Sequence, residues 1–243
     1  MLRITIAFLL ALLVGLVVFL PLKLVLGLAG PGLDLSRAEI HGTVWNGSVR
    51  GARISGQPLR RVQIRLHPLA LFTGRARADW VITDPGLRGR GQAAIDGRGD
   101  WSVSHARLAA SPDRLGIRPI PGLTETALVD ISIERLDYRG GACAQAAGEI
   151  NASIPGGQAQ AFGVALPDMT GPVRCRDGRL AVLVSGESAD MTVEAEALVA
   201  AASSEWQIGV ETANPDLANA LAFTGFVQTA NIWRRNGVTD HAR

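Results

Sequence analysis

The chain has 243 residues, of which 47% are hydrophobic and 19% are charged, and its formal net charge at pH 7 is +2. This composition excludes a disordered tail and a multi-span membrane protein, and the net charge alone implies no special partner. The length allows a short N-terminal segment followed by one domain of ordinary size.

Beyond the N-terminal segment, a basic half precedes an acidic half. Pro31 to Ile120 contain 14 Arg and 7 acidic residues, whereas Pro121 to Arg243 contain 8 Arg and 15 acidic residues. Two interpretations remain open. The halves are either solvated strand faces that differ in charge, or the basic half lies against anionic lipid head groups.

The N-terminal segment is strongly apolar. Ile6 to Leu22 contain no charged or strongly polar side chain, Lys23 interrupts the run, and Leu24 to Ala29 continue it. A membrane span needs about 20 apolar residues. Because the Lys23 side chain can reach the interface, Ile4 to Leu28 are long enough to span a bilayer.

A cleavable signal peptide is the competing interpretation, with an apolar region of about 7–15 residues that ends in a small-x-small site. Here the run is longer, and Gly27-Leu28-Ala29 is a poor site. We therefore predict an uncleaved transmembrane anchor over residues 1–29 and a periplasmic β-rich domain over residues 30–243. Arg3 precedes the run, which favours a cytoplasmic N-terminus. The predicted location is the cell inner membrane, in a single pass.

Apolar and polar residues alternate along the rest of the chain, as is typical of antiparallel strands with one buried face. The predicted fold class is mainly β: a single N-terminal transmembrane helix followed by a curved antiparallel β-sheet, groove-like or sandwich, with one or two short helices. The alternating apolar residues are Val62, Ile64 and Leu66; Ala76, Ala78, Trp80 and Ile82; Leu87, Ala93 and Ile95; Val129, Ile131 and Ile133; Ile150, Ala152 and Ile154; Leu180, Val182 and Val184; Met191, Val193, Ala195 and Ala197; Trp206, Ile208 and Val210.

Two short helices are predicted between strands. Pro68 to Phe72 are followed by Gly74, which can adopt the left-handed conformation that ends a helix. Pro215 to Phe223 follow Asn214, a good N-cap with Pro in the first helical position. Pro and Gly also cluster at residues 111–122, which we interpret as a joint between two halves of one sheet.

Cys143 and Cys175 are the only two cysteines in the chain. Two thiols in an exported domain are typically bridged, so we predict a disulfide between them. The alternative is two buried, unpaired cysteines. Neither cysteine belongs to a C-x-x-C motif, so the sequence gives no indication of a redox or metal role.

The sequence contains no recognisable catalytic or metal-binding motif. The histidines His41, His67, His105 and His241 are scattered and form no zinc-binding pattern. No Ser lies in a G-x-S-x-G turn, and no phosphate-binding loop lysine is present. We therefore predict a protein that is not an enzyme, with no cofactor, no metal and no nucleic-acid partner.

Four segments, in this order, resemble the protein N family of the bacterial type II secretion pathway. The first is Ile40 to Gly47, with a G-T-x-W-x-G pattern, and the second is Leu59 to Trp80, with an L-x-P-x-x-L-x-x-G pattern between two strands. The third comprises Cys143 to Gly148 and Gly171 to Cys175. The last is Asn214 to Gly225.

This resemblance implies a bitopic accessory component of the inner-membrane platform that exports folded periplasmic proteins across the outer membrane. Such a component acts by protein–protein interaction, and its implied partners are inner-membrane components of the platform. The family is also distantly similar to AsmA-like proteins, in which a curved β-sheet groove holds acyl chains. The alternative function is therefore an envelope module that binds or transfers lipid, with membrane phospholipid as its partner.

Overall fold

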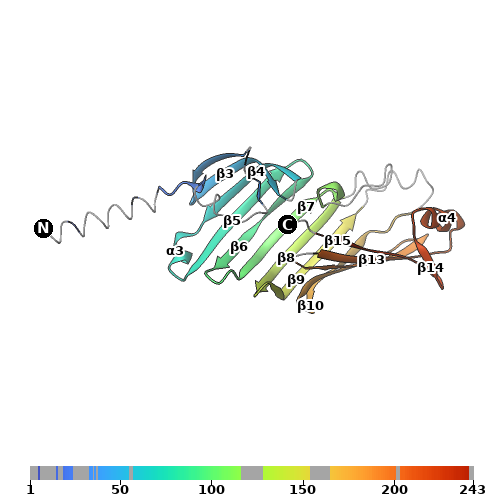
Figure 1. The fold of residues 1–243 in the computed structure, drawn as a ribbon. Helices are drawn as coiled ribbons and strands as arrows, with labels where there is room; N and C mark the ends of the chain where they lie inside the picture. Colours follow the sequence, from blue (N-terminus) through green and yellow to red (C-terminus); the bar gives the residue numbers. More distant parts are fainter. Residues whose placement is uncertain are drawn as a thin grey trace. The chain divides into compact units, whose positions relative to one another are not determined.

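Strands dominate the part of the chain that the structure describes. The computed structural model describes Thr5, Gly15, Ser36 and residues 19–23, 33–34, 38–54, 57–115, 128–153, 165–200 and 203–240 (Figure 1). The chain forms two units, Met1–Asp84 and Pro85–Arg243. Within each unit the strands pair in antiparallel fashion.

In the first unit, β3 lies between β4 on one side and both β1 and β2 on the other, and β5 follows β4. A short helix, α3, connects β4 to β5. The elements are β1 (Leu33–Asp34), β2 (Glu39–Thr43), β3 (Asn46–Ile54), β4 (Gln57–Leu66), α3 (Pro68–Leu71) and β5 (Arg75–Asp84).

In the second unit the strands follow one another in chain order from β6 to β13, and β15 then lies between β13 and β14. The elements are β6 (Leu87–Asp96), β7 (Trp101–Ala110), the 3-10 helix η1 (Pro112–Leu115), β8 (Leu128–Arg139), β9 (Ala142–Ser153), β10 (Met169–Arg176), β11 (Arg179–Glu187), β12 (Met191–Val199), β13 (Ser203–Thr212), α4 (Pro215–Phe223), β14 (Val227–Thr229) and β15 (Ile232–Asp240).

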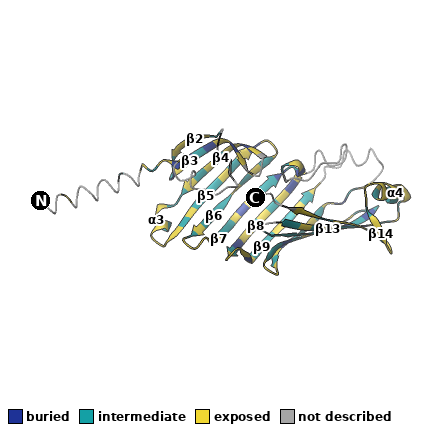
Figure 2. Cartoon of the chain, viewed as in Figure 1, coloured by how far each residue is buried: buried dark blue, intermediate teal, exposed yellow. Residues whose placement is uncertain are grey.

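The prediction of a mainly β chain with two short helices is confirmed. On β4, for example, Val62, Ile64 and Leu66 are half-buried, whereas the residues between them are exposed. Figure 2 shows the same alternation of half-buried and exposed positions along many strands. Successive side chains of a strand point to opposite faces, so a period of two in the sequence gives each sheet one apolar and one polar face.

Both predicted helices lie where local signals placed them. Helix α4 begins after Asn214, whose side chain accepts hydrogen bonds from the backbone N–H groups of Asp216 and Leu217. Helix α3 begins at Pro68, and Gly74 ends the turn after it with φ +71°. Gly tolerates this left-handed conformation because it has no β-carbon.

The alternation pattern did not predict strand β10, which contains Gly171 and Pro172. Pro lacks an N–H donor and Gly weakens strands, so both residues argue against an inner strand. The structure supplies the reason for the Gly: a β-carbon at Gly171 would collide with the backbone of Leu183 on the neighbouring β11. That requirement comes from a residue distant in the sequence and is invisible to a local pattern.

The predicted transmembrane helix is wrong. Among the residues that the structure describes, no helix is both long enough and apolar enough to cross a membrane. Most of the predicted span, residues 1–29, lies outside the described residues, but residues 19–23 at its C-terminal side are described.

These last residues of the apolar run belong to the first unit. Pro21 forms an antiparallel bridge with Thr43, and the Val44 N–H donates a hydrogen bond to the Leu20 carbonyl at 3.1 Å. Leu22 is only 3% exposed and forms a core cluster with Val44, Val49 and Ala52. An apolar run shows only that its residues avoid water, and here protein covers Leu22.

Two other predicted features lie partly outside the described residues. Of the predicted joint at 111–122, the structure describes Ser111 and η1. The Ser111 N–H, just before η1, donates a hydrogen bond to the Gly86 carbonyl at 2.8 Å. The end of the predicted strand at Ile154 also lies outside them.

Candidate functional site: faces and edge of the sheets

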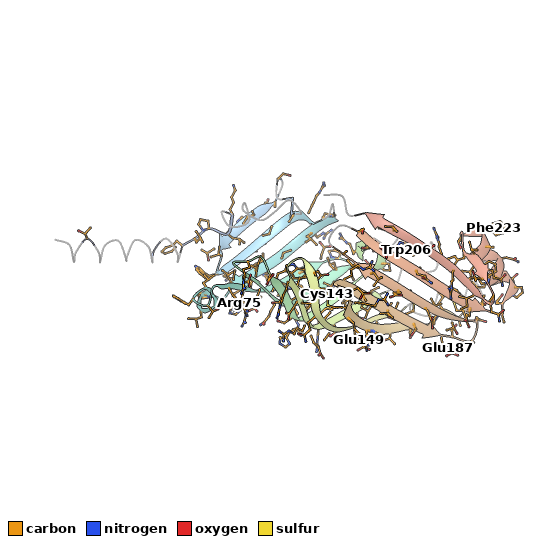
Figure 3. The ribbon with its side chains drawn as sticks, turned by 60° about the horizontal axis from the view of Figure 1, so that its bottom comes forward. Arg75, Cys143, Glu149, Glu187, Trp206 and Phe223 are labelled. Carbon is orange, nitrogen blue, oxygen red and sulfur yellow. A yellow bond between two sulfur atoms is a disulfide. The ribbon has the colours of Figure 1, made fainter. Side chains whose placement is uncertain are left out.

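A disulfide joins Cys143 of β9 to Cys175 of β10, with Cα atoms 5.6 Å apart (Figure 3). The two strands pair from Met169 opposite Ala152 to Val173 opposite Gly148. The bridge lies just beyond that ladder. The Cys143 N–H also donates to the Gly178 carbonyl at 2.7 Å, so the bridge and this bond tie the ends of three strands together.

One face of the second unit carries apolar residues on several strands, interrupted on β10 by Gly171, which lies opposite Ile150. Ile131 lies opposite Ile150, and Val184 lies opposite Ala195, which in turn faces Ile208. All five side chains are half-buried rather than buried. A face sealed by a second layer would bury them, so this apolar surface is only partly shielded from solvent in the described structure.

Helix α4 shields one end of this apolar face. Met191, Val193 and Val210 are buried there, and Leu217 and Leu221 of α4 pack against them. Phe226 and Trp233 complete the cluster. This cluster of the second unit is therefore centred on β12 and β13 beneath the helix, whereas other buried residues, such as Ala110, Val173 and Ala181, lie outside it.

An aromatic pair lies at the other end of the same unit. Trp101 on β7 stacks on Tyr138 of β8, with ring centroids 4.3 Å apart and planes 7° from parallel. The two residues are cross-strand partners. Burial raises the pKa of the Tyr138 phenol above its ordinary value, because the charged phenolate loses hydration there.

The polar face of the first unit is basic. Arg50 lies opposite Arg61, and Arg65 lies opposite Asp79. Cross-strand partners lie on the same face of a sheet, as do residues two positions apart on one strand, so these residues share one face. Its five arginines are all exposed and form no ion pair with any described residue: Arg50, Arg61, Arg65, Arg75 and Arg77. The Asp79 carboxylate instead forms a hydrogen bond with His67 Nε2 at 2.8 Å.

The polar face of the second unit is richer in carboxylates, some of which are paired. Glu196 pairs with Arg176, and Glu205 pairs with Arg179 at 3.0 Å. Glu149, labelled in Figure 3, accepts a hydrogen bond from the Thr170 hydroxyl at 3.1 Å. The division of charge seen in the sequence is thus carried by polar sheet faces.

A shallow depression of about 460 Å³ lies beside β15 in the second unit. Glu196, Glu205, Gln207, Asn236 and Val238 contribute to its lining. The Trp206 ring beneath it covers Gly237, where a β-carbon would come within 2.5 Å of the ring, and the Arg235 guanidinium lies 6.0 Å from the ring centroid.

The histidines that the structure describes do not form a common site. His67 contacts Asp79, His41 lies 3.9 Å from Glu39, and His105 is exposed on β7. His241 lies outside the described residues. Within the described ranges, no three His, Cys, Asp or Glu side chains come together in a group that would hold a metal ion.

Sequence reasoning missed two features of these surfaces. No local sequence pattern predicts the outer side of β15 that the described strands leave unpaired, because pairing depends on which strands become neighbours in the fold. The exposed apolar turn at α3 did have a signal: Leu69 and Phe72 fall between two strongly alternating strands, in a segment with Arg75 and Arg77 directly after it.

Comparison with known proteins gives one match. The family described as "Type II secretion system (T2SS), protein N" matches residues 34–232, which cover most of both units. Neither the curated proteins nor the solved structures contain a match. The matched range includes the segments that suggested this resemblance from the sequence, and the chain therefore belongs to the type II secretion system protein N family.

Proposed function

We propose that this protein acts in type II secretion through contacts with inner-membrane components of the secretion platform, without catalysing a reaction. Membership of the family makes it a type II secretion component, associated with the cell envelope. The Cys143–Cys175 bridge supports a periplasmic position of the second unit, because disulfides persist in that oxidising compartment.

The observation that carries this proposal is the outer side of β15. β13 pairs with β15 along its whole length, from Ile232 to Asp240, whereas β14 pairs with it only at Ile232–Arg234. Among the described strands, none bonds to the outer side of residues 235–240. A sheet edge of this kind offers backbone donors and acceptors to an extended segment of a partner.

In-cell photo-crosslinking tests the proposal. A photoreactive amino acid replaces Val238, which is exposed on β15, in cells that produce the secretion system. The matched control replaces Leu183, an exposed apolar residue of β11, because β11 is already paired on both sides. Capture of a platform protein from position 238 and not from 183 is expected. Equal capture from both positions, or none from 238, would exclude edge docking.

A second candidate function is binding or transfer of phospholipid, which the half-buried apolar face of the second unit favours. Acyl chains would cover Ile131, Ile150 and Val184, which are only partly shielded. Photo-crosslinkers at Val184 and at the adjacent Ser185 distinguish the two faces, because consecutive strand residues point to opposite sides. A phospholipid adduct from 184 alone, detected by mass spectrometry, supports this function, and adducts from neither position would reject it.

A further inference from the structure

The connection between β4 and β5 holds an apolar tip out in solvent. Leu69 is 78% exposed and Phe72 is 88% exposed, and α3 contains no buried residue. The tip is nevertheless ordered by local bonds. The Thr73 hydroxyl donates to the Ala70 carbonyl at 2.7 Å, and the Gly74 N–H donates to the Leu71 carbonyl at 3.0 Å. The fold thus fixes two large apolar side chains where they contribute nothing to its own core.

Three unpaired arginines belong to the same hairpin. Arg75 directly follows Gly74, and Figure 3 shows it at the end of the hairpin that carries α3. Arg77 lies two residues further along, and its carbonyl accepts a hydrogen bond from the His67 N–H at 2.8 Å. Arg65 lies near the end of β4, on the same polar face. The carboxylate opposite it, Asp79, forms a hydrogen bond with His67. Because three arginines face this one carboxylate, the hairpin keeps a net positive charge.

From these two features we infer that the α3 turn is a membrane-contact site, which inserts Leu69 and Phe72 into the surface of a bilayer that contains anionic phospholipid. Arg65, Arg75 and Arg77 then bind the phosphate groups of the lipids. Interfacial anchors combine an apolar surface with basic residues in this way, because each contact alone is weak. Arg suits the role, since its guanidinium donates two parallel hydrogen bonds to one phosphate.

An acidic protein surface would satisfy the arginines, but it offers no apolar medium for Leu69 and Phe72. An apolar groove on a protein would accept the tip, but it leaves the arginines without counter-charges. An anionic bilayer supplies both the counter-charges and the apolar medium, because charged head groups lie at its surface and hydrocarbon lies just beneath them. The tip lies in the first unit, and its lipid contact is independent of the partner proposed for β15.

The chain contains its own matched control. The sequence Phe-Thr-Gly ends both helices, at Phe72-Thr73-Gly74 after α3 and at Phe223-Thr224-Gly225 after α4. Phe223 is 93% exposed, and the Thr224 hydroxyl donates to the Ala220 carbonyl at 3.1 Å, much as Thr73 bonds to Ala70. The residues after Gly225 are Phe226, Val227 and Gln228, so arginines do not follow this second tip as they follow the first.

The test places a fluorophore beside each tip in the full-length protein, which is mixed with vesicles. The variants Thr73→Cys and Thr224→Cys are labelled with an environment-sensitive dye, and the two native cysteines do not react because they are bridged. The vesicles contain phosphatidylethanolamine and phosphatidylglycerol, with a fraction of the acyl chains spin-labelled as a quencher. Both labelled variants contain the same N-terminal apolar run. Any binding of that run to the vesicles therefore affects both dye positions and does not account for a difference between them.

Several-fold stronger quenching at position 73 than at 224 is expected, together with its loss when phosphatidylcholine replaces phosphatidylglycerol. The double variant Arg75→Glu/Arg77→Glu should abolish the excess quenching, whereas the double reversal Arg234→Glu/Arg235→Glu should leave the quenching at position 73 unchanged. High salt should weaken it in the unaltered chain, which tests the charge dependence without any risk of misfolding.

Equal quenching at the two positions would overturn the inference, as would quenching at 73 that is insensitive to anionic lipid, to the arginine reversal and to salt. Replacement of Leu69 and Phe72 by Ser supplies the apolar arm of the test. Both side chains are exposed, so the unfolding transition should be unchanged while the excess quenching is lost. Retained quenching in that variant would equally contradict insertion of the tip.

Discussion

The Leu22 side chain occupies the space that a β-carbon on Gly47 would need: such an atom would collide with Leu22 Cδ2. Leu22 comes from the N-terminal apolar run and Gly47 from the start of β3. Their contact shows that the end of the run packs on the first unit and that Gly is required where the chain passes beneath it.

We predict that Leu22→Ala destabilises the first unit by about 2–5 kcal/mol, because it leaves a cavity among Val44, Val49 and Ala52. Gly47→Ala should cost about 1–3 kcal/mol by overpacking. The double variant should be more stable than the sum of the two predicts, because the shortened Leu22 side chain removes the closest collision of the new methyl group and leaves only that with the Thr43 carbonyl. Denaturant unfolding followed by circular dichroism measures all three variants.

Phe19→Ala is the control for this cycle, because Phe19 belongs to the same apolar run but is exposed. Its effect on the unfolding free energy should be small. Strictly additive effects of Leu22→Ala and Gly47→Ala would show that the two residues do not touch.

Removal of the disulfide should destabilise the second unit. The bridge closes a loop with a sequence separation of 32 residues, and the chain-entropy estimate for a loop of this size is about 3–4 kcal/mol. We expect Cys143→Ala/Cys175→Ala to lower the unfolding free energy by about this amount. A reductant should destabilise the unaltered protein but not the double variant, and a similar response of both to reductant would contradict the bridge as the source of the stability.

The ionisation of Tyr138 should oppose folding at alkaline pH. Burial raises the pKa of its phenol in the folded state, whereas the unfolded chain ionises near the ordinary value of about 10. The unfolded chain then binds fewer protons, so the unfolding free energy is unaffected below that pH and decreases as the pH rises through the folded-state pKa.

Tyr138 is the only tyrosine in the chain, so phenolate absorbance reports on it alone. Its titration in the folded protein should lie at higher pH than in denaturant. Tyr138→Phe should remove both the absorbance change and this part of the alkaline destabilisation, while the stack on Trp101 persists. Coincident titrations in the folded and denatured protein would refute the effect of burial.

Asn214→Ala should destabilise α4 by about 1 kcal/mol. The Asn214 side chain accepts hydrogen bonds from the Asp216 and Leu217 N–H groups, at 3.0 and 3.3 Å, and these donors have no partner within the helix. Hydrogen exchange of the first helical amides should accelerate. Asn219→Ala, at an exposed position within the same helix, serves as the control. It should slow the hydrogen exchange of the same amides or leave it unchanged.

Local sequence signals sufficed where the cause is local. The Asn214-Pro215 pair specifies the start of α4 through one side chain and one fixed backbone angle, both within a single turn. Likewise, Val62, Ile64 and Leu66 predict β4 because successive strand residues point to opposite faces. Neither prediction required knowledge of what lies across from these residues.

Residues whose role depends on a distant partner were misjudged or missed. Gly171 was not placed in a strand, because the need for Gly arises from Leu183 on β11. Leu22 was assigned to a lipid-embedded helix, because hydropathy does not distinguish lipid from a protein core. The order of the edge strands, with β15 between β13 and β14, also follows from contacts that no window of the sequence contains.

From the sequence alone, the mainly β character, the two helices, the basic and acidic halves and the resemblance to the family all followed. They follow because the periodicity of side chains, the conformational limits of Pro and Gly, and the order of motifs are properties of neighbouring residues. Only the tertiary structure decided what covers each apolar residue: the core for Leu22, helix α4 for Val210, and solvent for Phe72. Burial depends on residues brought together from different parts of the chain, and that is settled by packing rather than by pattern.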